Sequence, residues 1–125
     1  MPIIGNHVKL EAGEQHRDRV RMFYRGILGC AELPAPMPNA DLFRMPDGFV
    51  LGVFYSPAEQ ARTDEQCLAG TWLEIMTPDV DGLIGKLRQF GVKEIEYWDK
   101  NHFYFHSPGG PVFRIAPEAE RGSQS

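Results

Sequence analysis

The stretch that decides the fold spans residues 71–92 and reads TWLEIMTPDVDGLIGKLRQFGV. Residues 72–76 alternate between aliphatic side chains and side chains that are aromatic, charged or sulfur-containing. This two-residue period is typical of a strand with one packed face. Residues 80–90 instead place apolar side chains three and four positions apart, which predicts a helix with one apolar stripe. We expect Thr77 to cap this helix and Gly91 to end it. The helix should cover one face of the strand and leave the other free to line a cavity with Trp72, Glu74 and Met76.

Size and charge exclude several classes of protein. The 125 residues are 42% hydrophobic and carry a formal net charge of −4, so we expect one domain that needs no disulfide or metal to hold its core. Phosphate binding requires clustered positive charge, and the sequence has no run of Lys or Arg, which argues against nucleic acid and anionic membranes. Without a basic leader or a membrane-length apolar window, the chain is expected to be cytoplasmic. We interpret Cys30 and Cys67 as buried or idle thiols.

The same periodicities assign the rest of the chain. In the first half they predict a strand at 6–11, a helix at 14–28 and strands at 31–33, 40–45 and 49–55. In the second half, strands follow the helix at 93–97, 101–106 and 112–116. The polar stretch 56–70 best fits a linker or a lid loop between the halves.

The second half repeats the first. Adding 62 to the positions of five residues of the first half gives identical residues in the second, namely Gly91, Phe105, Pro108, Gly110 and Val112. The opening strands match at an offset of 65, from His7 to Trp72, which places a three-residue insertion in the first strand-to-helix turn. We therefore interpret the chain as one domain over 1–117, built from a module at 4–56, a linker at 57–70 and a module at 71–117, with a flexible tail at 118–125.

A strand, a helix and three strands, repeated with PDG and PGG turns, resemble the vicinal oxygen chelate superfamily of glyoxalases, bleomycin-resistance proteins and extradiol dioxygenases. The resemblance covers residues 6–117 and rests on HVKL at 7–10, FYRGILG at 23–29, DVDGL at 79–83 and SPGGPVFR at 107–114. It implies an α+β fold in which two βαβββ modules form a cupped, partly closed mixed sheet with helices on its outer face. It also implies a homodimer.

The resemblance further implies where a metal would lie. Enzymes of the family hold a divalent metal on inward side chains, at positions that fall here on His7, Gly52, Trp72 and Arg114. Only His7 can ligate, whereas catalytic zinc takes about three protein ligands, and the guanidinium of Arg114 repels a dication. We therefore predict no cofactor and no metal-binding residue. A re-routed set of His7, Glu74 and His106 is the less favoured alternative.

If the alternate side chains point inward, the cup has aromatic walls with a few charges. We predict that it binds a small aromatic or anionic organic molecule through His7, Lys9, Phe54, Trp72, Glu74, Tyr104 and Arg114. Arg114 or Lys9 would hold a polar group of the ligand. Each also has a structural alternative, an ion pair of Arg114 with Glu74 and of Lys9 with Glu11, and Trp72 could simply fill the cavity.

A binding protein of the glyoxalase and bleomycin-resistance type is accordingly favoured over an enzyme, and no catalytic residue is assigned. The first alternative is a metal-dependent glyoxalase-like isomerase or dioxygenase with ligands around His7. A second is metal-free catalysis with His7 or Glu74 as general base. The third is a structural or regulatory subunit whose own side chains fill the cup.

Overall fold

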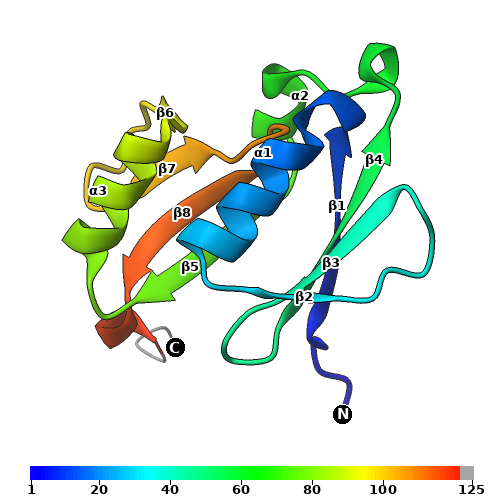
Figure 1. The fold of residues 1–125 in the computed structure, drawn as a ribbon. Coiled ribbons are helices and arrows are strands. Elements are labelled where there is room, and N and C mark those ends of the chain that lie inside the picture. The colour runs from blue at the N-terminus through cyan, green and yellow to red at the C-terminus, as the bar shows by residue number, and fades with distance from the viewer. Residues whose placement is uncertain (122–125) are drawn as a thin grey trace. The chain divides into compact units, whose positions relative to one another are not determined.

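A computed structural model of the chain describes residues 1–121 and divides it into two compact units, Met1–Arg62 and a second unit that starts at Thr63. Figure 1 shows that each unit contains a sheet and a helix that follows its first strand. None of the helices within residues 1–121 is long and apolar enough for a membrane crossing. The predicted tail at 118–125 begins with a 3-10 turn at Glu118–Glu120, and residues 122–125 lie outside the described part.

The first unit has a four-stranded mixed sheet in the order β1-β4-β3-β2. Its strands are β1 (His7–Gly13), β2 (Ala31–Leu33), β3 (Ala40–Arg44) and β4 (Val50–Ser56). β1 runs parallel to β4, and the other neighbours are antiparallel. The predicted helix is confirmed as one continuous segment. It consists of a 3-10 turn (Glu14–His16), the helix α1 (Arg17–Arg21) and a π-helical turn (Met22–Ile27). Gly29, in the left-handed region at φ 72°, follows its end.

The apolar face of this helical segment forms the core of the first unit. Val20, Phe23 and Tyr24 are buried, and the ring of Tyr24 stacks on Phe43 of β3 with centroids 4.9 Å apart. Leu10 of β1, paired with Val53 in the strand register, belongs to the same layer because alternate residues of a strand share a face. β1 therefore has one face packed toward the helix, as the alternation at 6–11 predicts.

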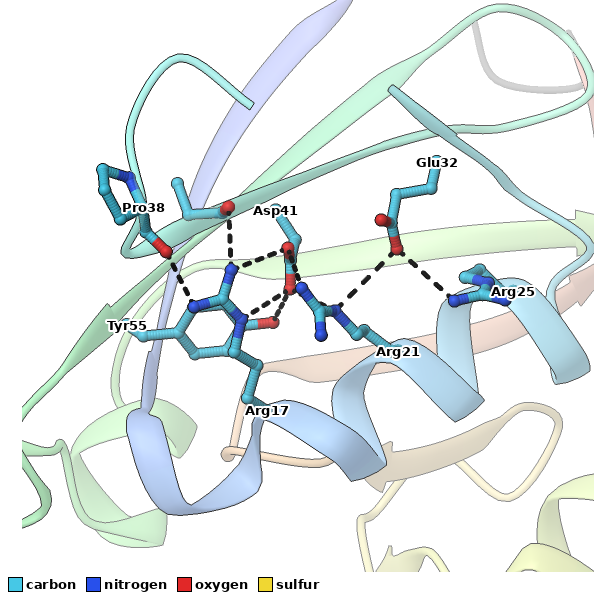
Figure 2. A network of polar contacts seen from close by, with 8 residues as sticks. Arg17, Arg21, Arg25, Glu32, Pro38, Asp41 and Tyr55 are labelled. Atoms are coloured by element: carbon cyan, nitrogen blue, oxygen red, sulfur yellow. Dashed lines mark hydrogen bonds and ion pairs between the residues drawn. The ribbon is translucent and has the colours of Figure 1, made fainter. Parts of the chain in front are cut away.

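A buried carboxylate ties the helix to the sheet in the first unit (Figure 2). Asp41 of β3 is 3% exposed and accepts hydrogen bonds of 3.0–3.2 Å from Arg17 and Arg21 and one of 2.8 Å from the hydroxyl of Tyr55. Arg17 also donates to the carbonyl oxygen of Pro38 at 2.8 Å. Burial by itself would raise the pKa of Asp41, but the Arg17, Arg21 and Tyr55 donors outweigh it and lower the pKa.

The second unit repeats the connectivity of the first, with sheet order β5-β8-β7-β6. Its strands are β5 (Trp72–Thr77), β6 (Lys93–Ile95), β7 (Phe103–His106) and β8 (Val112–Pro117). β5 is parallel to β8, as β1 is to β4. The long helix α3 (Val80–Phe90) follows β5 and ends at Gly91 as predicted, with φ 92°.

Two local predictions need correction. The cap of α3 is Asp79, whose side chain accepts a hydrogen bond from the backbone N–H of Gly82 at 3.0 Å, and not Thr77. Thr77 acts one step earlier, because its hydroxyl oxygen accepts from the N–H of Asp79. The predicted linker also contains structure, namely a 3-10 turn (Ala58–Gln60) and the short helix α2 (Asp64–Leu68).

Reciprocal hydrogen bonds at its start explain why α2 forms. The Thr63 side chain accepts from the N–H of Gln66, and the Gln66 side chain accepts from the N–H of Thr63. This capping box satisfies two otherwise free donors of the first turn. α2 belongs to the second unit, where Asp64 accepts a hydrogen bond from Lys93 of β6 at 2.9 Å.

Removal of the buried carboxylate should destabilise the protein. We expect Asp41→Ala to lower the free energy of unfolding at neutral pH by about 2–3 kcal/mol, because two guanidinium groups and a phenol lose their shared acceptor. Urea denaturation measures this, and Asp18→Ala, an exposed carboxylate of α1, should cost less than about 0.5 kcal/mol. Since the pKa of Asp41 is lowered by folding, the difference between wild type and Asp41→Ala should shrink below about pH 4. A difference that stays constant on acidification would contradict this role.

Candidate functional site

In each unit the sheet face opposite the helix, called here the open face, carries the residues predicted to bind a ligand. In the first unit the register pairs His7 with Val50, Lys9 with Gly52 and Glu11 with Phe54. In the second unit it pairs Trp72 with Val112 and places Glu74, Arg114 and Tyr104 side by side on three strands. Paired residues of neighbouring strands point to the same side of a sheet. Within each unit, the predicted residues therefore share one face.

The open face of the first unit holds an ion pair and a filled space. Lys9 lies 3.8 Å from Glu11, the pairing expected as its structural alternative, and its ammonium is 5.3 Å from the ring centroid of Phe54. A Cβ at Gly52 would lie 3.1 Å from Leu42 and 3.4 Å from Phe54, so these side chains occupy the space above the glycine. His7 is exposed at the start of β1.

Three aromatic rings meet on the open face of the second unit, and we call Trp72, Tyr97 and Tyr104 the aromatic cluster. Their centroids lie 5.1 Å apart for Trp72 and Tyr97, 5.6 Å for Trp72 and Tyr104 and 4.8 Å for Tyr97 and Tyr104. Tyr104 is buried, whereas Trp72 and Tyr97 are half-exposed. The indole N–H of Trp72 donates to the carbonyl oxygen of Leu68 at 2.8 Å, so the last turn of α2 fixes the orientation of the indole.

Polar groups connect this cluster to β8. Arg114 donates through Nε to the carboxylate of Glu74 and through Nη1 to the hydroxyl of Tyr104 at 3.3 Å. The hydroxyl of Tyr104 donates to Asp99 at 2.8 Å, and Asp99 lies 3.8 Å from Nη1 of Arg114. The predicted ion pair of Arg114 with Glu74 is therefore confirmed. The guanidinium also positions Tyr104, a contact that strand periodicity does not predict.

His102 lies between two carboxylates. Its Nδ1 is 2.7 Å from Asp99 and its Nε2 is 2.8 Å from Glu120, in the 3-10 turn at Glu118–Glu120. The contact with Glu120 is the main cause that raises the pKa of His102; burial opposes it and Asp99 adds to it. The N–H of Asn101, the Tyr104 hydroxyl and His102 together lower the pKa of Asp99 to about 2, so Asp99 is ionised at neutral pH.

Of the residues at the predicted metal positions, only His7 carries a side chain that ligates divalent cations. Among residues 1–121, no three His, Cys, Asp or Glu side chains are grouped to hold a metal ion. Arg114 keeps a positive charge on the open face, and its partner Glu74 belongs to the re-routed set. His106, also of that set, has Nδ1 2.8 Å from the carbonyl oxygen of Gly110. A guanidinium repels a dication, so Arg114 brings a charge of the wrong sign to one of the four expected metal positions.

The sequence reasoning missed Tyr97, Asp99 and Glu120. Periodicity predicts Tyr97 in a strand at 93–97, but β6 ends at Ile95, so the side chain of Tyr97 joins the site from the loop between β6 and β7. Asp99 lies in the same loop, and Glu120 falls within the predicted tail. The signal available was the run Tyr-Trp-Asp at 97–99, placed just before the strand that carries Tyr104.

The architecture of both units is that of the glyoxalase, or vicinal oxygen chelate, fold, which confirms the resemblance at the level of fold. Similar solved structures include the fosfomycin resistance protein FosX from Mesorhizobium loti, with a TM-score of 0.69 and 13% identity over 99% of this chain and 100% of that one. Lactoylglutathione lyase from Agrobacterium tumefaciens has a TM-score of 0.66 and 18% identity, with 98% of each chain covered. The trypanothione-dependent glyoxalase I of Leishmania major has a TM-score of 0.68 and 20% identity over 95% of this chain and 89% of that one. The sequence matches no protein-family model and has no significant match among curated proteins.

The contact between His102 and Glu120 can be tested in solution. Because Glu120 contributes most to the raised pKa of His102, Glu120→Gln should lower that pKa. An NMR titration of the histidine ring protons measures it. Glu118→Gln, which removes a charge from the same turn, should leave the value close to that of wild type. An unchanged pKa in Glu120→Gln would show that the turn does not contact His102 in solution.

Proposed function

We propose that the protein binds a small organic molecule with a flat, aromatic portion on the open face of its second unit, and that no metal ion takes part. The observation that carries the proposal is the aromatic cluster, because Trp72 and Tyr97 remain partly exposed on the sheet face opposite α3. Trp98, which is 80% exposed, adds a further ring 5.6 Å from Tyr97. Exposed rings of this kind offer a ligand large apolar contacts at low entropic cost.

Preorganisation supports a binding role. The indole of Trp72 is held by its hydrogen bond to Leu68, and the ring of Tyr104 by its hydrogen bond to Asp99. Side chains that are already fixed lose little rotamer freedom when a ligand binds, so more of the contact energy remains as affinity. The partly exposed indole of Trp72 is therefore suited to stacking on a ligand, and the buried ring of Tyr104 packs against it.

The names of the similar structures agree with a small-molecule ligand. They refer to fosfomycin, lactoylglutathione and trypanothione, each a small organic compound. We take only this general class of ligand from the comparison, because identities of 13–20% support the fold and not a particular substrate. The metal-free part of the proposal rests on Arg114 and its pairing with Glu74.

If the ligand proposal is correct, a screen of aromatic compounds should find some that raise the melting temperature of the protein. A ligand that binds only the folded state stabilises that state. For any such compound, Trp72→Leu should raise the Kd by about tenfold or more, because a stacking surface is lost. Phe103→Leu is the matched control, because Phe103 belongs to the same sheet on the face that packs toward α3, and it should change the Kd less than about twofold. Titration calorimetry on the folded variants measures both. Equal effects of the two substitutions, or a screen without binders, would overturn the proposal.

The metal proposal predicts that protein purified without chelators holds far less than one equivalent of zinc, nickel, manganese or iron. His7→Ala should not change that content, because the other positions of the expected site are Gly52, Trp72 and Arg114. Elemental analysis of both proteins measures it. Stoichiometric metal that His7→Ala removes would instead support the metal-dependent isomerase or dioxygenase with ligands around His7.

A further inference from the structure

The charges around the aromatic cluster indicate which aromatic ligands it selects, an inference that rests on the proposed function. We infer that the ligand is a cation at neutral pH, an organic ammonium or a related nitrogen base, rather than an anion. This reverses the preference that Arg114 suggests when it is considered alone.

The charge count of the polar network is negative. Three carboxylates belong to it, on Glu74, Asp99 and Glu120, against the single permanent cation of Arg114. Even when His102 is protonated, the group keeps one net negative charge. The lysines of the flanking elements have carboxylate partners of their own, since Lys93 lies 2.9 Å from Asp64 and Lys100 lies 3.9 Å from Glu96.

Arg114 is poorly placed to receive an anion. Its Nε is bonded to Glu74, and its Nη1 is bonded to the hydroxyl of Tyr104 and lies 3.8 Å from Asp99. An anionic ligand would have to displace Glu74, or bind at Nη2 and come close to the carboxylates of Glu74 and Asp99 that flank the guanidinium. Like charges at such distances repel, and the half-buried setting weakens solvent screening.

A cationic ligand would be attracted both by the aromatic rings and by the carboxylate of Glu74. The faces of indole and phenol rings attract cations through their quadrupole, and indole does so most strongly. Glu74 follows Trp72 by two residues on the same face of β5, at a spacing of about 6.6 Å along a strand. A ligand that stacks on Trp72 can therefore place a cationic group close to the carboxylate of Glu74, where ring and charge act together.

Three probes of similar size test this inference: benzyltrimethylammonium, benzyl alcohol and phenylacetate. We expect the cation to bind at least about tenfold more tightly than the anion in low salt, and the preference to fall as salt screens the charges. Glu74→Gln should reduce the ratio between the Kd of the anion and the Kd of the cation several-fold. Glu94→Gln is the matched control, because it removes the same charge from the opposite face of the sheet, where Glu94 pairs with Arg88.

NMR titration of wild type and both variants separates the outcomes. Phenylacetate binding as tightly as the cation would overturn the inference and leave the proposed aromatic site standing. An equal narrowing in Glu94→Gln would also overturn it, because the effect would then come from overall charge. Failure of all three probes to bind would overturn the inference, and if Trp72→Leu then changes the affinity of no aromatic compound, the proposed function falls as well.

Discussion

The pairing of Arg114 with Glu74 is the constraint on which the open face of the second unit depends. A guanidinium on a half-buried strand position must find acceptors, because its charge cannot be removed near neutral pH. Here it uses the neighbouring carboxylate of β5 and the hydroxyl of Tyr104. That choice fixes the ring of Tyr104, which in turn donates to Asp99. In this pair the guanidinium carries a charge that repels a dication, and it is hydrogen-bonded to the carboxylate of Glu74, which the re-routed metal site would need as a ligand.

Each unit is organised around one carboxylate, but on opposite faces of its sheet. Asp41 lies between helix and sheet, where Arg17, Arg21 and Tyr55 satisfy it and where it stabilises the fold. Asp99 lies at the open face, where Tyr104 and His102 satisfy it. The chemistry is the same, since a carboxylate outside bulk water needs charged or hydroxyl donors. The position decides the consequence, which is stability in one unit and a preorganised surface in the other.

The regular part of the fold could be predicted from the sequence because it depends on short periods. Alternation located every strand to within a few residues and put Trp72, Glu74 and Arg114 on one face. α2 was missed because five residues are too few to show a helical period, although the Thr63 and Gln66 capping pair was readable. Tyr97 and Asp99 were missed because their contacts come from a loop, which has no period. Glu120 meets His102 across 18 residues of sequence, a pairing that only the folded chain reveals.

Gly52, Trp72 and Arg114, which the resemblance places at metal positions, are each held by neighbours within their own unit. A side chain at Gly52 would meet Leu42 and Phe54, so a ligand there requires its neighbours to move. Trp72 is fixed by α2 through Leu68, and a smaller histidine in its place would lose ring contact with Tyr97 and Tyr104. Replacing Arg114 with a carboxylate would put it beside Glu74 and near Asp99 without a cation between them. In the second unit the two substitutions are each unfavourable on their own, so Trp72, Tyr104, Arg114 and Glu74 form a self-consistent arrangement on one face.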